Sequence, residues 1–383
     1  MQKNVLGLLC AAVLIIILIA GLWPFHAPKN QVNWLSNSDG LHFGEYGVVL
    51  SPGVSAFAGS KDAVSCSLEI WLQPDHSDTG GTILAFYKPE DHIVGFSMHQ
   101  SIDDLLLRRV TASQEHPAKT GFYIQHVFRD DKQLFVTVTS TAQGTAVYLN
   151  GALVRTATRF ALSGEDLTGQ LIVGNYALAE DSWQGQIKGL ATYNRALTEA
   201  QVLQHYTAWT TNRNAEIKRE GPITLYLFNE ARGTVVHNQI NSETDLRIPE
   251  HFLILHPPFL QRPWTEFQPG WIYWKNVLIN VTGFIPLGFF FCAYFVSVRR
   301  PNRAVLITIV LGGVVSLTIE VLQAFLPTRN SGMTDLITNT LGTAIGARLY
   351  SCDPVRSLFA IVGLGGAVYP DGHSGCRETA PPA

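Results

Sequence analysis

The stretch EVLQAFLPTRNSGMTDLITN, residues 320–339, joins the end of one apolar segment to the start of another through a short loop. Both segments are apolar enough for lipid, yet they carry four polar side chains, Glu320, Gln323, Asp335 and Asn339. Such residues are costly inside a membrane and are rare there unless they face one another or a water-filled cavity. The stretch therefore predicts a helical hairpin of a membrane protein, with its polar groups turned toward other helices.

The composition of the 383-residue chain excludes several classes of protein. Charged residues make up only 15 % of it and the formal net charge is −3, so no basic surface for nucleic acid is expected. The sequence has no Cys/His pair at zinc spacing, no glycine-rich phosphate loop and no Gly-x-Ser-x-Gly motif. Only Cys66 lies in the long polar middle of the chain, which therefore cannot hold an internal disulfide.

Apolar runs predict four to five membrane spans. Residues 5–25 form an uncharged run of 21 residues with no small-residue cleavage site after it, so we expect a retained anchor. Residues 277–298 and 304–326 are also long enough to cross the bilayer. Residues 333–351 are apolar apart from a few polar positions. Residues 357–369 number only 13, which leaves a short span, a re-entrant piece or an interfacial helix open.

Basic residues set the predicted orientation, because they tend to stay on the cytoplasmic side of short loops. We expect the chain to lie in the cytoplasmic (inner) membrane with its N-terminus in the cytoplasm. Residues 26–270 are then extracytoplasmic, as is the loop that contains Arg329. The aromatic residues just before residue 277 suit the outer interface. The basic residues assigned to the cytoplasmic side are Lys3, Arg299, Arg300, Arg303, Arg348 and Arg356.

This orientation places a group of polar residues at one membrane depth near the outer surface. They occur in pairs three or four residues apart, so each pair projects from one face of its helix, and the three faces can converge. Arg329 is the cation that would neutralise one of the two acids. The members of this predicted polar cluster are Asn276, Asn280, Glu320, Gln323, Arg329, Asp335 and Asn339.

The residues leave two interpretations of the polar cluster open. A carboxylate in the membrane core costs roughly 2.5 to 3.5 kcal/mol, which favours a functional site with Glu320 or Asp335 as the candidate catalytic acid or base. Arg329 would then hold an anionic head group. Alternatively, the polar side chains only hydrogen-bond the helices together, at ~0.6 to 2 kcal/mol each. Of the two interpretations, we expect that the protein is not an enzyme, and the role of Glu320 and Asp335 stays open.

Residues 26–270 show short alternating runs with frequent turn signals, which is the pattern of an antiparallel β-sandwich. Asn150 and Gly151 fit the two positive-φ positions of a tight hairpin. Thr198 and Gln201 form a capping box at the start of a short helix. The clearest predicted strands are CSLEIWLQP, GTILAFY, KQLFVTVTS, TAVYLNGALV, GQLIVGNY and GQIKGLATYN.

Two tryptophans and four acids of this region bear on ligand binding. Trp71 and Trp183 fall within alternating strands, so we expect core residues rather than platforms for a sugar. We expect no resident metal or cofactor, because paired surface acids are usually solvated and a calcium site needs about six oxygen ligands. A calcium ion is the alternative, and the acids considered for it are Asp103, Asp104, Glu180 and Asp181.

The C-terminal part, over residues 271–350, resembles the VanZ-like family of bacterial membrane proteins. The resemblance rests on NVLINVTGFIPLGF, on Glu-x-x-Gln in the third span, on RNSGMTD and on NTLGTAIG. The family is named for low-level teicoplanin resistance, so the resemblance implies a link to glycopeptide tolerance. Asn276 stands where relatives often carry Asp, which counts against acid chemistry there. The matched family positions are Asn280, Pro286, Gly288, Glu320, Gln323, Arg329, Asp335, Asn339, Gly342 and Gly346.

The polar middle resembles the laminin-G-like, or concanavalin A-like, jelly roll over residues 41–206. The segments that carry this resemblance are SLEIWLQP, VYLNG and GQIKGLATYNRALTEAQVLQHY. Relatives often have Asp where Lys188 stands, which argues against a calcium-supported site at that position. The resemblance implies an all-β sandwich with a carbohydrate as the expected class of ligand.

We therefore predict a multidomain membrane protein of the cell envelope, in which an all-β jelly-roll sandwich is joined to an α-helical transmembrane bundle. The expected partners are membrane lipids and a glycan or cell-wall polymer, and no nucleic acid. The alternative is a membrane enzyme or carrier that acts on a lipid-linked envelope substrate. The predicted parts are an anchor at 1–25, the extracytoplasmic sandwich at 26–270, VanZ-like helices at 271–351, and a short apolar segment with a polar tail at 352–383.

Overall fold

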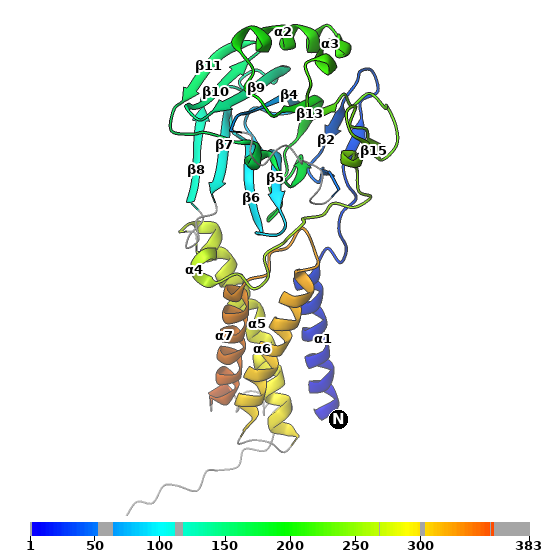
Figure 1. Cartoon of the computed structure of the whole chain (residues 1–383). Helices are drawn as coiled ribbons and strands as arrows, with labels where there is room; N and C mark the ends of the chain where they lie inside the picture. The colour runs from blue at the N-terminus through cyan, green and yellow to red at the C-terminus, as the bar shows by residue number, and fades with distance from the viewer. Residues whose placement is uncertain are drawn as a thin grey trace, which may run out of the picture. The chain divides into compact units, whose positions relative to one another are not determined.

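The computed structural model describes residues 2–52, 64–111, 118–267, 269–298, 303–352 and 354–355. The chain divides into two compact units (Figure 1), a helical unit of Met1–His26 with Pro258–Ala383 and a sandwich unit of Ala27–Pro257. The short apolar segment predicted at residues 357–369 lies outside the described residues, as do Arg299, Arg300 and Arg356.

The sandwich unit contains two eight-stranded sheets in which neighbouring strands pair antiparallel, so the predicted jelly-roll-like fold class is confirmed. The first sheet has the order β1 (Val32–Trp34), β2 (Leu41–Phe43), β13 (Gly185–Tyr193), β4 (Cys66–Pro74), β9 (Leu134–Thr141), β10 (Gly144–Leu149) and β11 (Ala152–Ala157), with β14 (Thr224–Tyr226) paired to β13. The second has the order β15 (Val235–Val236), β16 (Leu246–Arg247), β3 (Val49–Leu50), β12 (Gln170–Val173), β5 (Gly80–Lys88), β6 (Ile93–Ser101), β7 (Asp104–Thr111) and β8 (Ala118–Ile124). Two 3-10 helices lie in the connections of this unit, η1 (Gly164–Leu167) between β11 and β12 and η2 (Ser242–Thr244) between β15 and β16.

A hydrophobic core fills the space between the two sheets, because alternate side chains of each strand point inward. Leu68, Ile70 and Leu72 of β4 and Phe96 and Met98 of β6 are buried in this core. The same alternation turns the side chains between them to the opposite faces of the two sheets.

The two tryptophans that we predicted to be core residues have different environments. Trp183 is buried in the main core, and its Nε1 donates to Gln100 Oε1 at 2.7 Å. Trp71 is only partly buried and packs against a second apolar cluster on the other face of the first sheet. The Lys188 ammonium lies 5.6 Å from the centroid of its ring. Lys188 thus has a packing partner at the position where relatives often carry Asp.

Helix α2 (Glu199–Thr210) and the short α3 (Asn214–Arg219) follow the last long strand, β13. The predicted capping box is present, because Thr198 Oγ1 accepts from Gln201 N at 3.4 Å and Gln201 Oε1 accepts from Thr198 N at 3.1 Å. The predicted hairpin is also present, with Asn150 at φ 51° and Gly151 at φ 83°.

Glu69 fixes α2 to the first sheet from a fully buried position on β4. Its Oε1 lies 2.8 Å from His205 Nδ1, and its Oε2 accepts from Tyr193 at 3.0 Å and from Trp209 Nε1 at 3.2 Å. Since His205 and Trp209 belong to α2, these contacts join the helix to β4 and β13. A buried carboxylate is tolerated when hydrogen bonds surround it in this way.

Replacement of Glu69 should therefore destabilise the sandwich strongly. We expect Glu69→Ala to lower the free energy of unfolding by about 3–5 kcal/mol, because three buried donors lose their acceptor. Glu165→Ala is the matched control, since that side chain is 61 % exposed and its ion pair with Lys88 is worth about 0–1 kcal/mol. Pulse proteolysis of the full chain in urea gives the comparison, and equal midpoints for the two variants would contradict this role.

The helical unit consists of α1 (Gln2–Leu22), α4 (Pro263–Glu266), α5 (Trp271–Ser297), α6 (Ala304–Gln323) and α7 (Met333–Ser351). Within the described residues, three helices are long and apolar enough to cross a membrane: Lys3–Leu22, Trp271–Ser297 and Ala304–Gln323. Helix α7 has the predicted bounds but is too polar to count among them, so a total of four to five spans stays a prediction.

Residues 258–270 belong to the helical unit, although we assigned them to the sandwich. The backbone of Gln261 accounts for this, because Gln261 N donates to Ser331 O at 3.1 Å and Met333 N donates to Gln261 O at 2.9 Å. These bonds join the segment before α5 to the start of α7. The sandwich unit consequently ends at Pro257, before the predicted boundary.

Helices α5 and α7 approach each other closely across glycines. A Cβ built on Gly288 of α5 would lie 2.0 Å from Thr343 O. On α7, a Cβ on Gly342 would lie 2.2 Å from Val281 O, and one on Gly346 would lie 2.0 Å from Ile285 O. Small residues at such positions let helix backbones pack together in membranes. Gly288 thus allows the backbones of α5 and α7 to pack together.

This close packing makes a specific prediction for two glycines of the same helix. Gly288→Ala should lower the yield and thermal stability of the folded protein, because the added methyl collides with the α7 backbone. Gly283→Ala should leave both unchanged or slightly improved, since no atom lies within 4 Å of its Cβ position and Ala favours a helix. Size-exclusion profiles and unfolding temperatures in detergent measure the effect. Equal behaviour of both variants would disprove the tight contact.

Candidate functional site

Five of the seven residues in the predicted polar cluster line one pocket of the helical unit. The pocket has a volume of about 160 Å³ and is formed by α1, α5, α6 and α7. The late residues of α1 and α6 meet the early residues of α5 and α7 there, so all contributions come from one end of the four helices. The five polar residues in its wall are Asn280, Glu320, Gln323, Asp335 and Asn339.

Each carboxylate of the pocket is held by a donor from the helical unit. Glu320 is only 1 % exposed, and its Oε2 accepts from the backbone N–H of Gly332 at 2.8 Å. Asp335 Oδ1 accepts from Asn280 Nδ2 at 2.7 Å, which joins α7 to α5. Gly332 is the residue that caps α7, so both acids are fixed around the start of that helix.

The other two amides direct their NH₂ groups away from the carboxylates. Gln323 Nε2 donates to the backbone oxygen of Gly21 on α1 at 2.7 Å, and Asn339 Nδ2 donates to Ser316 Oγ on α6 at 3.0 Å. The oxygens of these two amides, Gln323 Oε1 and Asn339 Oδ1, are buried and have no hydrogen-bond partner among the described residues. Two residues of the pocket wall therefore carry a buried acceptor without a partner among the described residues.

Asn276 and Arg329 are not part of this pocket. Asn276 is exposed near the start of α5 and is absent from the residues that line the cavity. Arg329 does not form the expected ion pair with Glu320 or Asp335 among the described residues. Its Nε donates to the backbone oxygen of Trp23 at 3.0 Å, and its Nη2 contacts the same oxygen. A carbonyl at the end of α1 thus takes the place that we assigned to an acid.

Glu266 contributes to the region although the sequence analysis did not single it out. It ends α4 and accepts from the backbone N–H of Thr334 at 3.1 Å, and its carboxylate also contacts the Thr334 hydroxyl. Thr334 lies in the first turn of α7, where N–H groups lack intrahelical partners. The sequence did contain a signal for a short helix here, because Pro263 is followed three residues later by the acid Glu266. We had assigned this segment to the sandwich.

The sandwich unit has separate polar sites, one of them around Asp181. Its Oδ2 accepts from the Thr82 hydroxyl at 2.5 Å and lies 3.1 Å from His99 Nδ1, while Ser97 Oγ lies 2.9 Å from His99 Nε2. Burial raises the pKa of Asp181, but the hydrogen bonds from His99 and Thr82 outweigh it, and the net pKa is below the usual range. For the adjacent Glu180, burial and the charge of Glu45 raise the pKa.

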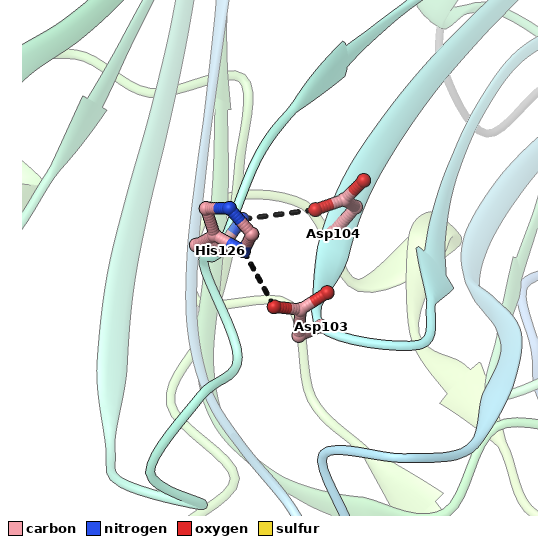
Figure 2. A group of neighbouring side chains, drawn as sticks. All are labelled: Asp103, Asp104 and His126. Carbon is pink, nitrogen blue, oxygen red and sulfur yellow. Dashed lines mark hydrogen bonds and ion pairs between the residues drawn. The ribbon is translucent and has the colours of Figure 1, made fainter.

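Asp103, Asp104 and His126 form a second group, drawn in Figure 2. Their candidate ligand atoms lie within 4.8 Å of one another, and neither Glu180 nor Asp181 belongs to the group. His126 Nδ1 lies 2.6 Å from Asp103 Oδ2, and the His126 backbone N–H donates to Asp104 Oδ1 at 2.9 Å. The hydrogen bond from His126 lowers the pKa of Asp103. Two carboxylates that already bond to His126 fall short of the oxygen set that calcium requires.

The sandwich also has a larger pocket along the edge of its second sheet. Its volume is about 430 Å³, within the range of about 300–1,000 Å³ that is typical of small-molecule sites. Polar side chains in its wall come from Gln170 on β12, Thr234 before β15 and Arg247 on β16. Gln170 Nε2 donates to Ser51 O at 2.8 Å. No metal-ligand set lies in this wall.

Comparisons with solved structures and curated proteins add little. The binding domain of botulinum neurotoxin DC in complex with rat synaptotagmin II is 14 % identical, with a TM-score of 0.34 over 47 % of this chain and 45 % of that chain. The binding domain of serotype D in complex with N-acetylneuraminic acid is 12 % identical, with a TM-score of 0.33 over the same shares. The chain thus spans a little under half the length of these structures, and at these scores they carry no argument. No curated protein matches the chain.

Two protein families do match. Residues 43–203 match the model of the concanavalin A-like lectin/glucanases superfamily, and residues 202–357 match the VanZ/LLP1 model. The second match begins in α2, earlier than the resemblance at 271–350, and so includes the end of the sandwich unit and helices α4 to α7 of the helical unit. Both resemblances noted in the sequence are therefore confirmed. The chain joins a VanZ-like region, which carries candidate membrane spans, to a laminin-G-like, concanavalin A-like domain.

Proposed function

We propose that this chain is a multi-pass protein of the bacterial cytoplasmic membrane whose sandwich unit binds a carbohydrate or another cell-envelope polymer. One observation carries the proposal: the lectin-like sandwich lies in the sequence between two candidate spans, α1 and α5. Both of its ends are therefore tethered to the membrane, which keeps a bound polymer at a high effective concentration near the helices. The link to glycopeptide tolerance that the VanZ-like resemblance implies belongs to this proposal.

The proposed topology has a cytoplasmic N-terminus and an extracytoplasmic sandwich. Basic residues support it, because Lys3 precedes α1 and Arg303 precedes α6, at helix ends that the positive-inside rule assigns to the cytoplasm. Exposed aromatic residues lie at the helix ends that this topology assigns to the outer side, namely Trp23 after α1 and Trp271 and Trp274 at the start of α5. Tryptophans at such positions suit the outer membrane interface.

The 430 Å³ pocket is our candidate for the polymer-binding site of the sandwich. Arg247 and Gln170 offer N–H donors, and sugar hydroxyls would accept hydrogen bonds from them. The remaining wall is largely aliphatic, with Leu50, Val235 and Ile248, and could contact the apolar face of a sugar ring.

The experiment is a glycan and peptidoglycan-fragment array probed with the detergent-solubilised full chain. We expect at least one class of envelope glycan to bind, and Arg247→Ala to weaken that binding by about tenfold, as the loss of a charge-assisted hydrogen bond would. Arg232→Ala is the matched control, because Arg232 is exposed on the same unit and does not line the pocket. A blank array would count against the proposal. Equal binding by the two variants would show that the glycan binds to another part of the sandwich.

The second candidate function is a membrane enzyme or carrier for a lipid-linked envelope substrate. The pocket between the helices favours it, because Glu320 and Asp335 share one cavity whose wall contains no basic residue. In such an enzyme either carboxylate would act as acid or base on the substrate. A carrier would need only the binding properties of the same pocket.

A further inference from the structure

The helical pocket contains unpaired acceptors for a physical reason that can be read from its three amides. Asn280, Gln323 and Asn339 donate their NH₂ groups to Asp335, to Gly21 O and to Ser316 Oγ, respectively. The orientation of Gln323 is fixed by chemistry, since a backbone carbonyl can only accept. Its Oε1 is consequently left over, and Asn339 Oδ1 also has no partner in the arrangement in which Asn339 Nδ2 donates to Ser316 Oγ. The two side chains are only 8 % and 5 % exposed, so water at the surface does not readily satisfy these oxygens.

The charge of the pocket points in the same direction. Its wall contains two carboxylates and no lysine, arginine or histidine. The charged form of a buried carboxylate is costly without a cation, because desolvation is not offset by attraction. The nearest basic residue of the loop before α7, Arg329, uses Nε and Nη2 on the Trp23 carbonyl. The carboxylates and unpaired amide oxygens therefore suit a positively charged group that carries several N–H donors.

The depth of the pocket indicates where such a group would come from. Gly21 lies at the end of α1, Glu320 and Gln323 lie in the last turn of α6, and Asp335 lies in the first turn of α7. Exposed tryptophans, Trp23 and Trp271, mark the same ends of α1 and α5. Helix ends with such aromatic residues lie at the level of lipid head groups. The acceptors are thus at head-group depth rather than at the bilayer centre.

The shape of the pocket favours an organic cation over a metal ion. Its volume of about 160 Å³ exceeds the ~30 Å³ that one water molecule occupies, and its wall includes the apolar side chains Ile17, Ile279 and Phe284. A primary ammonium has three N–H donors, which matches in number the two carboxylates and one of the unpaired amide oxygens. The methylene groups attached to such an ammonium would contact the apolar part of the wall.

We propose that this pocket binds the primary ammonium group of a zwitterionic membrane lipid with a phosphoethanolamine head group. Arg329 fits the other half of that head group, because it is anchored to Trp23, two residues beyond Gly21 in the pocket wall, and a guanidinium binds phosphate well. The inference rests on the pocket and on the membrane location, and it is independent of glycan binding by the sandwich. It names the chemistry that the second candidate function would require.

The test uses the head group itself as the variable. The full chain, purified in detergent, is titrated with phosphatidylethanolamine, its N-monomethyl and N-dimethyl forms and phosphatidylcholine of identical acyl chains, and bound lipid is counted by native mass spectrometry. Each methyl removes one N–H donor while the positive charge remains. We expect affinity to fall along the series, with phosphatidylcholine at least about tenfold weaker, as the loss of hydrogen bonds to charged acceptors implies. Equal affinity across the series would overturn the proposal.

Variants locate the effect in the pocket. Glu320→Gln and Asp335→Asn should each remove most of the preference for phosphatidylethanolamine. Glu165→Gln removes one exposed negative charge from the sandwich unit, and Asn276→Ala removes an exposed amide of α5 that does not line the pocket, so both should keep the preference. An equal loss in Glu165→Gln would show a response to net charge alone and would overturn the site. The methylation series on the native chain remains decisive if a pocket variant does not fold.

A soluble amine tests whether the pocket binds the ammonium group of a lipid head group or that of a free small molecule. O-phosphoethanolamine in water should compete only weakly with the lipid, because it lacks the membrane-embedded body that brings the head group to this depth. Equal affinity for the soluble compound and the lipid would assign the pocket to a free amine and contradict the lipid part of the proposal. A glycan array that stays blank would leave this result untouched, so the two proposals fail separately.

Discussion

The close contact between α5 and α7 is the constraint on which the helical pocket depends. Backbone meets backbone at Gly288, Gly342 and Gly346, and no side chain fits between the helices there. Only at this separation can Asn280 on α5 reach Asp335 on α7 with a 2.7 Å hydrogen bond. The glycines and the polar residues therefore depend on one another. The glycines set the distance between α5 and α7, and the amide side chains bond across the helices at that distance.

Buried carboxylates accept hydrogen bonds in both units, but the helical pocket also contains unpaired amide oxygens. Glu69 in the sandwich is surrounded by three donors from β13 and α2, so its acceptors are satisfied within the fold. In the helical pocket, by contrast, the oxygens of Gln323 and Asn339 remain without partners among the described residues. Buried polar atoms are almost always satisfied in native proteins, so such exceptions need an explanation. A ligand that brings donors supplies one.

The sequence could predict the parts of the site that depend on local spacing. Glu320 and Gln323 share a helix face because they are three residues apart, and the predicted helix at 333–351 carries Asp335 and Asn339 as expected. The partner of Arg329 could not be predicted, because Trp23 is 306 residues away in the chain. Glu266 was missed for the same reason, since only long-range bonds between Gln261 and the start of α7 bring it there.

A cross-linking measurement tests the convergence of α5 and α7 most directly. In a full chain whose five cysteines are replaced by serine, Asn280→Cys paired with Asp335→Cys should react efficiently with a short bis-maleimide in membranes, as mass spectrometry of the linked peptides would show. The matched pair, Asn276→Cys with Asp335→Cys, should react poorly, because Asn276 is exposed one turn away and does not line the pocket. Equal cross-linking of both pairs, or none in the first, would contradict the account.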